Sequence, residues 1–573
     1  MSLAGLLTAV AEDPQLRSAL ASQPDTPEGR ERDLVAPSAL RPLLVAALAT
    51  GTVGGQGRFV LAVTATAREA EDLSAALGGF LPPHTVAVFP GWETLPHERL
   101  SPRSDTVGER IAVLRRLKHP EDDPFTGGSS PGGKHRLRVV VAPVRAMLQP
   151  VVAGLGDLDP VRLAVGDEAD PEDVITRLVE IGYARVEMVT KRGELAVRGG
   201  LLDVFPPTEE HPLRIEFFGD TVEEIRVFKV ADQRSAGQAE HGLWAPPCRE
   251  MLLTPSVRAR AKELAAKHPG VSDILGKIAD GITVEGMEAF AAVLADHMEL
   301  LIDHVPLGGM VLSCDPERIR TRAAELVSTS QEFLEASWAS AAAGGDAPID
   351  LGGSAFQPIA DIRATAAELG IPWWSLAPFG VGDSGEEEPH GASPGDSTQY
   401  RDGSRSGPFD MTIGAQAAPA YRGETDRMIG DVRQWLSDGW RVVLVTEGHG
   451  PAKRLAEVLR GEGFGARLGD IDAEPESGVP YVATGELRQG FSWPAVKLAV
   501  LTEADFAARG AARPGVRDER RMPSARRLGG VDPLQLKPGD YVVHEQHGVG
   551  RFVEMTSRTA AGEIGRASCR ERV

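Results

Sequence analysis

Short apolar runs alternate along this chain with stretches in which apolar residues recur every three or four positions. The runs VVVA at 139–142 and RVVLVT at 441–446 are rich in β-branched residues, which is typical of strands buried in a parallel sheet. Helical spacing is clearest at 67–77 and 316–343. Strands that alternate with helices in this way predict a multidomain α/β protein built on a doubly wound parallel sheet.

The pattern changes from residue 160 onward. A helix is predicted at 171–181, and the stretch 192–228 holds three short β-rich runs separated by turns at Pro206-Pro207 and Gly219-Asp220. These runs predict one small antiparallel sheet. We therefore expect a small α+β domain, inserted into the sheet domain at 160–245.

The same reading divides the rest of the chain. Helices are predicted at 257–267, 271–279 and 287–301, and alternating strands and helices return after residue 410. The predicted parts, in order, are a lead-in (1–40), the first part of the parallel-sheet domain (41–159), the inserted domain (160–245), the second part of the sheet domain (246–380), a flexible linker rich in Gly, Ser, Asp and Glu (381–409), a second small α/β domain (410–508), a basic linker (509–533), the start of a small β-barrel (534–562) and a tail (563–573).

The barrel start is predicted from LKPGDYVVHEQHGVGRF at 536–552, which contains a tight turn, a strand and the beginning of a returning strand. Two strands are too few to close a barrel, and the last segment, GEIGRASCRERV, has no alternating pattern. We therefore expect the barrel to be truncated and the tail at 563–573 to be foreign or frame-shifted sequence.

Composition and charge exclude several classes of function. The 573 residues are too many for a single core, and 42% hydrophobic with 25% charged residues is typical of folded globular protein. A formal charge of −21 disfavours tight general binding to DNA phosphates. Three cysteines without a CxxC pair indicate a reducing, cytoplasmic environment and exclude a Cys-rich zinc site, and no apolar run approaches the length of a membrane span.

Two charged stretches near the end of the chain offer candidate chemistry. The stretch HEQH at 544–547 lacks the i, i+4 spacing of the HExxH site, so no metal centre is predicted. Six arginines between 511 and 527 are interpreted as a solvated tether, with a DNA- or acid-facing contact as the alternative. No catalytic residue is predicted anywhere in the chain.

A phosphate loop is one candidate site of a parallel sheet, because phosphates bind in the loop after its first strand. Here an apolar run at 43–48 leads into the loop ATGTVGGQG at 49–57, whose glycines include Gly51, Gly54 and Gly57. A P-loop also needs a Lys followed by Ser or Thr, and this loop is followed by Arg-Phe instead. We predict a degenerate loop that binds no nucleotide, and no cofactor for this chain.

The antiparallel sheet carries the second candidate site. Arg214 alternates with apolar neighbours, so its side chain leaves by the opposite face, which Phe218 shares, while Arg198 precedes a Gly-Gly turn. Arg and aromatic residues are enriched at docking hot spots, and Arg can pair bidentately with carboxylates of a partner. Arg198, Arg214 and Phe218 are therefore candidates for binding a protein. The alternative is an exposed Arg packed along a sheet edge and a Phe turned into a second layer.

Three stretches, in this order and separation, resemble the transcription-repair coupling factor (Mfd) family, and the first two also resemble the N-terminal part of the excision-repair helicase UvrB. They are GWETLPHERLSPRSDTVGERIAVLRRL at 91–117, RGELAVRGGLLDVFPPTEEHPLRIEFFGDTVEEIRVF at 192–228 and LKPGDYVVHEQHGVGRF at 536–552. The resemblance covers nearly the whole chain up to residue 562, and the third stretch separates this family from UvrB.

The resemblance implies a UvrB-like sheet domain without a working P-loop and an inserted domain that binds UvrA. The positions that match the family's UvrA contacts are Arg198, Arg214 and Phe218. It also implies the start of a Tudor- or CarD-like barrel that binds the RNA polymerase β subunit, containing Lys537, Gly539 and Asp540. The superfamily 2 motor, which uses ATP and Mg in the full-length family, and the C-terminal domain that masks the UvrA site are expected to be absent here.

Three hypotheses for the function follow. The first is a non-enzymatic adaptor that recruits UvrA to stalled RNA polymerase for nucleotide excision repair, with weak DNA contact and no membrane contact. The second is a UvrB-type ATP-dependent DNA helicase that verifies damage, and it predicts nucleotide binding at 51–57. The third is a DNA-binding module that uses the arginines at 511–527, and it predicts an affinity that falls steeply with salt.

Overall fold

The computed structural model describes residues 2–21, 30–51, 57–95, 98, 100–122, 136–342, 356–378 and 411–507, together with the backbone of strands at 541–544, 548–560 and 563–572. The chain forms two compact units, Met1–Arg509 and Gly510–Val573, and each is described by itself.

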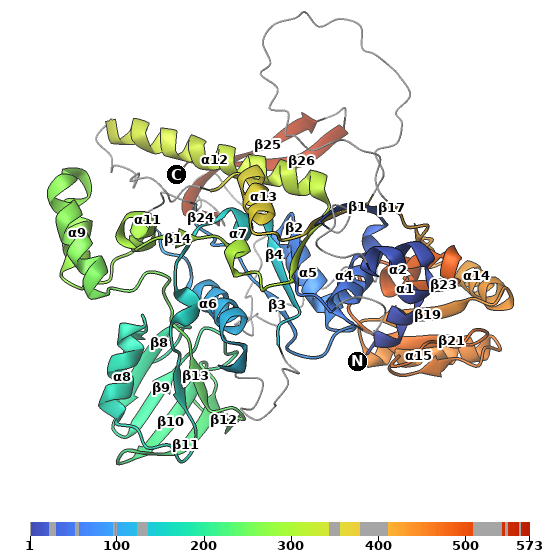
Figure 1. The fold of residues 1–573 in the computed structure, drawn as a ribbon, viewed down its shortest axis with the longest axis horizontal. Helices are drawn as coiled ribbons and strands as arrows, with labels where there is room; N and C mark the ends of the chain where they lie inside the picture. The colour runs from blue at the N-terminus through green and yellow to red at the C-terminus, as the bar shows by residue number, and fades with distance from the viewer. Residues whose placement is uncertain are drawn as a thin grey trace, which may run out of the picture. The chain divides into compact units, whose positions relative to one another are not determined.

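A seven-stranded parallel sheet forms the centre of the first unit (Figure 1). Its order is β17-β1-β16-β15-β2-β4-β3, and every neighbouring pair is parallel. The mixed α/β architecture with a large parallel sheet is therefore confirmed. Its strands are β1 (Glu31–Val35), β2 (Val60–Thr64), β3 (Val86–Val88), β4 (Val139–Pro143), β15 (Met310–Cys314), β16 (Trp373–Ala377) and β17 (Met411–Thr412).

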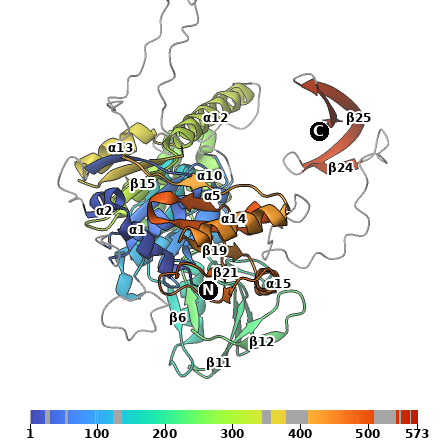
Figure 2. The same cartoon turned by 90° about the vertical axis from the view of Figure 1, so that its right-hand side faces the viewer.

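Helices cover both faces of this sheet, because alternate residues of the central strands belong to two separate apolar clusters. Val60 and Ala62 of β2 pack with α4 (Arg41–Ala49) and α5 (Ala67–Leu77). Leu61 and Val63 pack on the other face with α6 (Ser104–Lys118), α12 (Pro316–Ala342) and α13 (Ile359–Glu368). The long α12 can be followed in Figures 1 and 2. Because both faces of the sheet are buried, central strands such as β2 and β4 consist of consecutive apolar residues rather than alternating ones.

The start of the sheet differs from the prediction. The apolar run 43–48 lies in helix α4, whereas the first strand, β1, consists of the largely charged residues Glu31–Val35. Periodicity cannot separate a short buried helix from a buried strand. Pro42 near the helix start and three alanines favour the helix.

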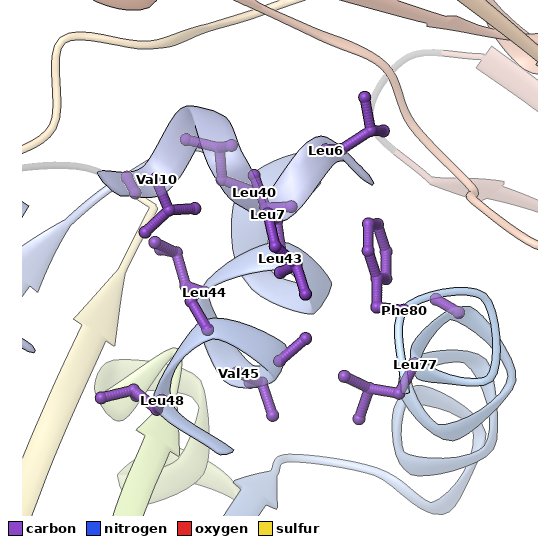
Figure 3. Close-up of a cluster of buried hydrophobic side chains, with 14 of the residues drawn as sticks. Leu6, Leu7, Val10, Leu40, Leu43, Leu44, Val45, Leu48, Leu77 and Phe80 are labelled. Carbon is purple, nitrogen blue, oxygen red and sulfur yellow. The ribbon is translucent and has the colours of Figure 1, made fainter. Parts of the chain in front are cut away.

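The N-terminal segment predicted as a lead-in is part of the core. Leu6, Leu7 and Val10 face side chains of α4 and α5 (Figure 3). The amide of Leu3 donates to the carbonyl oxygen of Gly79 (2.6 Å), and that of Gly5 donates to the carbonyl oxygen of Ile471 (2.7 Å). This segment, η1 (Ala4–Leu7), α1 (Thr8–Glu12) and α2 (Pro14–Ala21), therefore joins the large sheet to the second α/β domain.

The second α/β domain has its own six-stranded sheet, in the order β18-β22-β23-β19-β21-β20. The predicted strand at 441–446 is its central strand, parallel to both neighbours. The strands are β18 (Gln416–Ala417), β19 (Arg441–Thr446), β20 (Arg467–Leu468), β21 (Pro480–Thr484), β22 (Phe491–Trp493) and β23 (Leu498–Thr502), with helices α14 (Thr425–Ser437), α15 (His449–Gly461) and α16 (Glu503–Phe506).

Gly5 offers a direct test of the contact between these two domains. A Cβ at Gly5 would lie 2.0 Å from the carbonyl oxygen of Ala473, which is backbone and has little freedom to move away. We expect Gly5→Ala to lower the thermal unfolding midpoint, with a loss of about 1–3 kcal/mol from overpacking. Gly276→Ala, in the helix α10 (Ser272–Ala279), is the matched control, because nothing lies within 4 Å of its added Cβ. An unchanged midpoint for Gly5→Ala would contradict the contact.

The inserted domain contains a six-stranded sheet, in the order β12-β11-β10-β9-β8-β7, with α8 (Pro171–Glu180) on one face. The first strand of the domain, β6 (Val161–Leu163), and its last strand, β13 (Leu243–Ala245), form a separate two-stranded sheet, so the two ends of the insertion meet. The predicted antiparallel sheet within 192–228 is confirmed. The strands are β7 (Ala184–Arg185), β8 (Glu194–Arg198), β9 (Leu201–Val204), β10 (Leu213–Phe218), β11 (Thr221–Phe228) and β12 (Ser235–Gln238).

The segment after the inserted domain is helical with its own apolar cluster. Helices α9 (Pro255–Lys267) and α10 (Ser272–Ala279) agree with the predictions, but the helix predicted at 287–301 is wrong. There the structure has η7 (Met287–Phe290), α11 (Ala291–Leu294) and β14 (Met298–Glu299), which pairs with β5 (Val151–Val152). Strand pairing with a distant segment overrides the local helical spacing.

The second unit contains three antiparallel strands, β24 (Tyr541–His544), β25 (Gly548–Ala560) and β26 (Glu563–Arg572). The third strand occupies the stretch where the sequence predicted no strand pattern. Within the described residues of both units, no helix is long and apolar enough to span a membrane.

Candidate docking surface

The sheet of the inserted domain has two unequal faces. One face packs against α8 through an apolar cluster that includes Leu202 and Ile215. The opposite face, which we call the outer face, carries Arg214, Glu216 and Phe218 of β10, since buried and less buried residues alternate along this strand. The predicted orientation of Arg214 and Phe218 is therefore correct.

Two turns define one end of the outer face, which we call the tip. One turn joins β8 to β9 and the other joins β10 to β11, and the amide of Phe217 donates to the carbonyl oxygen of Gly200 (3.0 Å) between them. Gly219 in the second turn has a φ of +63°, which glycine adopts without steric penalty. Arg198 and Phe218 directly precede the two turns. The structure thus brings both predicted residues to the tip.

Phe218 is the prominent apolar group of the tip, because 79% of its surface is exposed. Arg198 is also exposed, and its guanidinium donates to the carbonyl oxygen of Glu187 at 2.9 and 3.3 Å. A carbonyl oxygen orients a guanidinium without neutralising its charge. The tip therefore presents an aromatic ring and a positively charged guanidinium to solvent.

Arg214 lies away from the tip and is engaged within the chain. Its Nε and Nη2 donate to the two carboxylate oxygens of Asp203 (2.7 and 2.8 Å), and the side chain is 17% exposed. Its guanidinium also lies 4.7 Å from the ring centre of Phe228. The hydrogen bonds to Asp203 raise the pKa of Arg214. The idea that Arg214 offers a free bidentate pair to a partner is corrected, because Asp203 already takes that pair.

A buried ion pair holds the segment that follows the inserted domain against helix α6. Arg110 of α6 and Glu250, which follows β13, approach to 2.5 Å (Nε to Oε1), and their side chains are 0% and 1% exposed. Trp92 Nε1 donates to the same carboxylate oxygen at 2.8 Å. Within the described residues, Nη2 of Arg110 and Oε2 of Glu250 have no hydrogen-bond partner. Both charges are therefore shielded from water, and each is neutralised mainly by the other.

A second set of contacts lies near this pair in sequence. Ser101 Oγ donates to Glu288 Oε2 (2.6 Å), and Arg249 Nη1 donates to Glu288 Oε1 (2.8 Å). Burial raises the pKa of Glu288 above its usual value, although the positive charge of Arg249 partly lowers it. Together with Arg110, Glu250 and Trp92, these residues form what we call the hub. The stretch 91–117 is therefore tied to residues 249–250, in the segment through which the chain leaves the inserted domain.

The glycines predicted as a degenerate phosphate loop do not follow a strand. Gly51 and Gly57 lie between helix α4 and strand β2, and Gly54 lies outside the described residues. The loop that follows the first strand is instead 36–40, between β1 and α4, with the sequence Ala-Pro-Ser-Ala-Leu. The predicted location of the loop is therefore wrong, because the preceding run is a helix.

The remaining predicted site residues lie outside the described part of the chain. These residues are Lys537, Gly539 and Asp540 at the start of the expected barrel. The arginines at 511–527 also lie outside it. Among the described residues, no group of three or more His, Cys, Asp or Glu side chains could hold a metal ion.

Comparison with known proteins adds two family matches. The model of the UvrB interaction domain matches residues 161–246, which include the tip and the whole outer face. The model of the CarD-like/TRCF RID domain matches residues 536–566.

Curated relatives match along nearly the whole chain. The transcription-repair-coupling factor of Mycobacterium tuberculosis is 44% identical over 98% of this chain. The chain is a transcription-repair-coupling-factor-like protein. The factors of Bacillus subtilis (26% identical, 92% of this chain and 42% of the relative) and Myxococcus xanthus (28% identical, 87% and 40%) extend the similarity. The chain spans less than half the length of these relatives, 43% of the first.

Two interactions of this transcription-repair-coupling-factor-like chain were not predicted, and only that of Asp203 has a signal in the sequence. Asp203 is an acidic residue within the apolar strand LLDV, which indicates a buried charge that needs a partner. Arg110 and Glu250 are 140 positions apart and belong to separate segments, so no local pattern links them.

Proposed function

We propose that this chain recruits the excision-repair protein UvrA through the tip of the inserted domain and links it to a stalled RNA polymerase. The observation that carries the proposal is a phenylalanine, Phe218, exposed on the outer face of a domain that matches the UvrB interaction domain. An exposed aromatic side chain gains free energy when a partner buries it, and such residues are common binding anchors.

The arrangement around Phe218 supports this role. Aromatic and Arg side chains dominate binding hot spots, and the tip offers both Phe218 and the charged Arg198. The residues stand on paired strands, which hold them in place before a partner arrives, so little ordering entropy is lost on binding. Arg214 would contribute mainly by fixing β9 to β10 through Asp203.

Binding of UvrA to the purified chain, measured by calorimetry, tests the proposal. We expect Phe218→Ala to weaken binding about tenfold or more, since central aromatic anchors contribute most of the energy of such contacts. Arg198→Ala and Arg214→Glu should weaken it too. Val179→Ala is the matched control, because Val179 is an exposed apolar residue on α8, on the other side of the sheet. Unchanged UvrA binding in all three tip and outer-face variants would reject the proposal.

The polymerase side of the proposal rests on residues 536–566, which match the CarD-like/TRCF RID domain. We propose that this segment, starting with Lys537, Gly539 and Asp540, contacts the RNA polymerase β subunit. Capture of the β subunit by the chain, lost on deletion of residues 536–566 while UvrA binding is retained, would support a separate polymerase contact.

The competing hypothesis of a UvrB-type ATP-dependent helicase is not favoured. The loop at 36–40, which follows the first strand, has neither glycine nor lysine, so it lacks the groups that wrap and neutralise phosphates. Calorimetry with ATP and Mg²⁺ separates the two hypotheses, since only the helicase requires binding. We propose no cofactor and no catalytic residue for the described part of this chain.

A further inference from the structure

The outer face carries charged side chains near the tip besides those of the predicted residues Arg198 and Arg214, among them Glu216 and Glu224. Backbone pairing places Arg198 opposite Leu201, Leu201 opposite Glu216, and Glu216 opposite Glu224. These four residues form one row across β8, β9, β10 and β11. With neighbouring strands about 4.8 Å apart, the row spans roughly 14 Å.

The β11 end of this row has an excess of negative charge. Two carboxylates directly opposite each other repel, which destabilises a sheet unless a cation lies between them. Arg226 supplies that cation, with contacts of 2.8 Å to Glu216 and 3.3 Å to Glu224. One arginine neutralises only one of the two carboxylates. One negative charge is therefore left over at this end, on side chains that are a third or more exposed.

The β8 end of the row has the opposite charge. Arg198 is held by the carbonyl oxygen of Glu187, so its positive charge is not cancelled by that contact. Between the two ends lies the half-buried Leu201 of β9, and the exposed Phe218 follows Glu216 by two residues on β10, beyond the row toward the turn. The row is thus a cation, an apolar centre and an anion in a fixed order.

We propose that the tip is a polarised contact that accepts its partner in one orientation. The partner surface it fits carries a carboxylate opposite Arg198, an apolar pocket for Phe218 and an arginine or lysine opposite Glu216 and Glu224. Opposite charges at the two ends give specificity and fix orientation, because a reversed partner places like charges together. This inference rests on the proposed function and adds to it the charge pattern that UvrA must present.

Charge reversal at the two ends of the row is the test, with UvrA affinity as the measurement. We expect Glu216→Lys and Arg198→Glu each to weaken binding about tenfold or more, and Glu216→Gln to weaken it less. Raising the salt concentration should weaken wild-type binding and reduce the difference between wild type and Glu216→Lys, because salt screens exposed charges. Unchanged thermal unfolding midpoints would show that the variants are folded.

Glu180→Lys is the matched control, since it makes the same charge change on the exposed end of α8, where a lysine also suits the helix C-terminus. Loss of binding in Glu216→Lys, with normal binding in Glu180→Lys, supports the polarised contact. If Phe218→Ala weakens binding and Glu216→Lys does not, this inference is overturned and the proposed function stands. If Phe218→Ala, Arg198→Glu and Glu216→Lys all bind UvrA normally, both fail.

Discussion

Glu250→Ala is expected to lower the free energy of unfolding by about 3–5 kcal/mol, since removing one partner of a buried ion pair leaves the other charge without compensation. Arg110 is fully buried and its remaining hydrogen bond from Nη1 reaches only the carbonyl oxygen of Pro90. Trp92 Nε1 would lose its acceptor as well. The thermal unfolding midpoint, together with hydrogen exchange at 90–110 and 246–250, measures the effect.

Two comparisons make this result specific to the buried pair. Glu325→Ala removes the acidic partner of an exposed ion pair on α12 and should change the midpoint little, because exposed pairs contribute little. The double variant Arg110→Met/Glu250→Leu should be more stable than Glu250→Ala alone, since no buried charge remains. If Glu250→Ala were as stable as the wild type, the buried pair would not stabilise the segment that leaves the inserted domain.

Asp203→Ala is expected to destabilise the inserted domain by about 2–3 kcal/mol, because Arg214 loses both hydrogen bonds to a buried carboxylate. The arginine is largely buried over Phe228, so water can replace the carboxylate only in part. Hydrogen exchange of the amides in β9 and β10 measures the opening free energy of this pair of strands.

The double variant Asp203→Ala/Arg214→Ala distinguishes the roles of the two residues. It should be less destabilised than Asp203→Ala alone, because the unpaired guanidinium is gone. Its UvrA binding is equally informative. Binding near that of the wild type would mean that neither Arg214 nor its pairing with Asp203 is needed for the contact. A loss as large as that of Phe218→Ala, with the exchange protection of β9 and β10 retained, would place Arg214 in the contact itself.

Local sequence patterns predicted secondary structure best in segments whose own apolar spacing determines which side chains are buried. The strands at 139–142 and 441–446, the helices α5 and α12 and the antiparallel sheet within 192–228 were all predictable. Alternation on β10 also fixed the face of Arg214 and Phe218. These features depend on periods of two and 3.6 residues, which are properties of the sequence.

Long-range contacts decided the rest. The helix predicted at 287–301 is broken because β14 within it pairs with the distant strand β5. The sequence by itself determined the α/β class, the inserted sheet and the face of that sheet on which Phe218 lies. Only the tertiary structure decided that Asp203 engages Arg214, that Arg110 meets Glu250, and that Arg198 shares one row with Glu216. Register and ion pairing join residues whose separation along the chain carries no information about their distance in space.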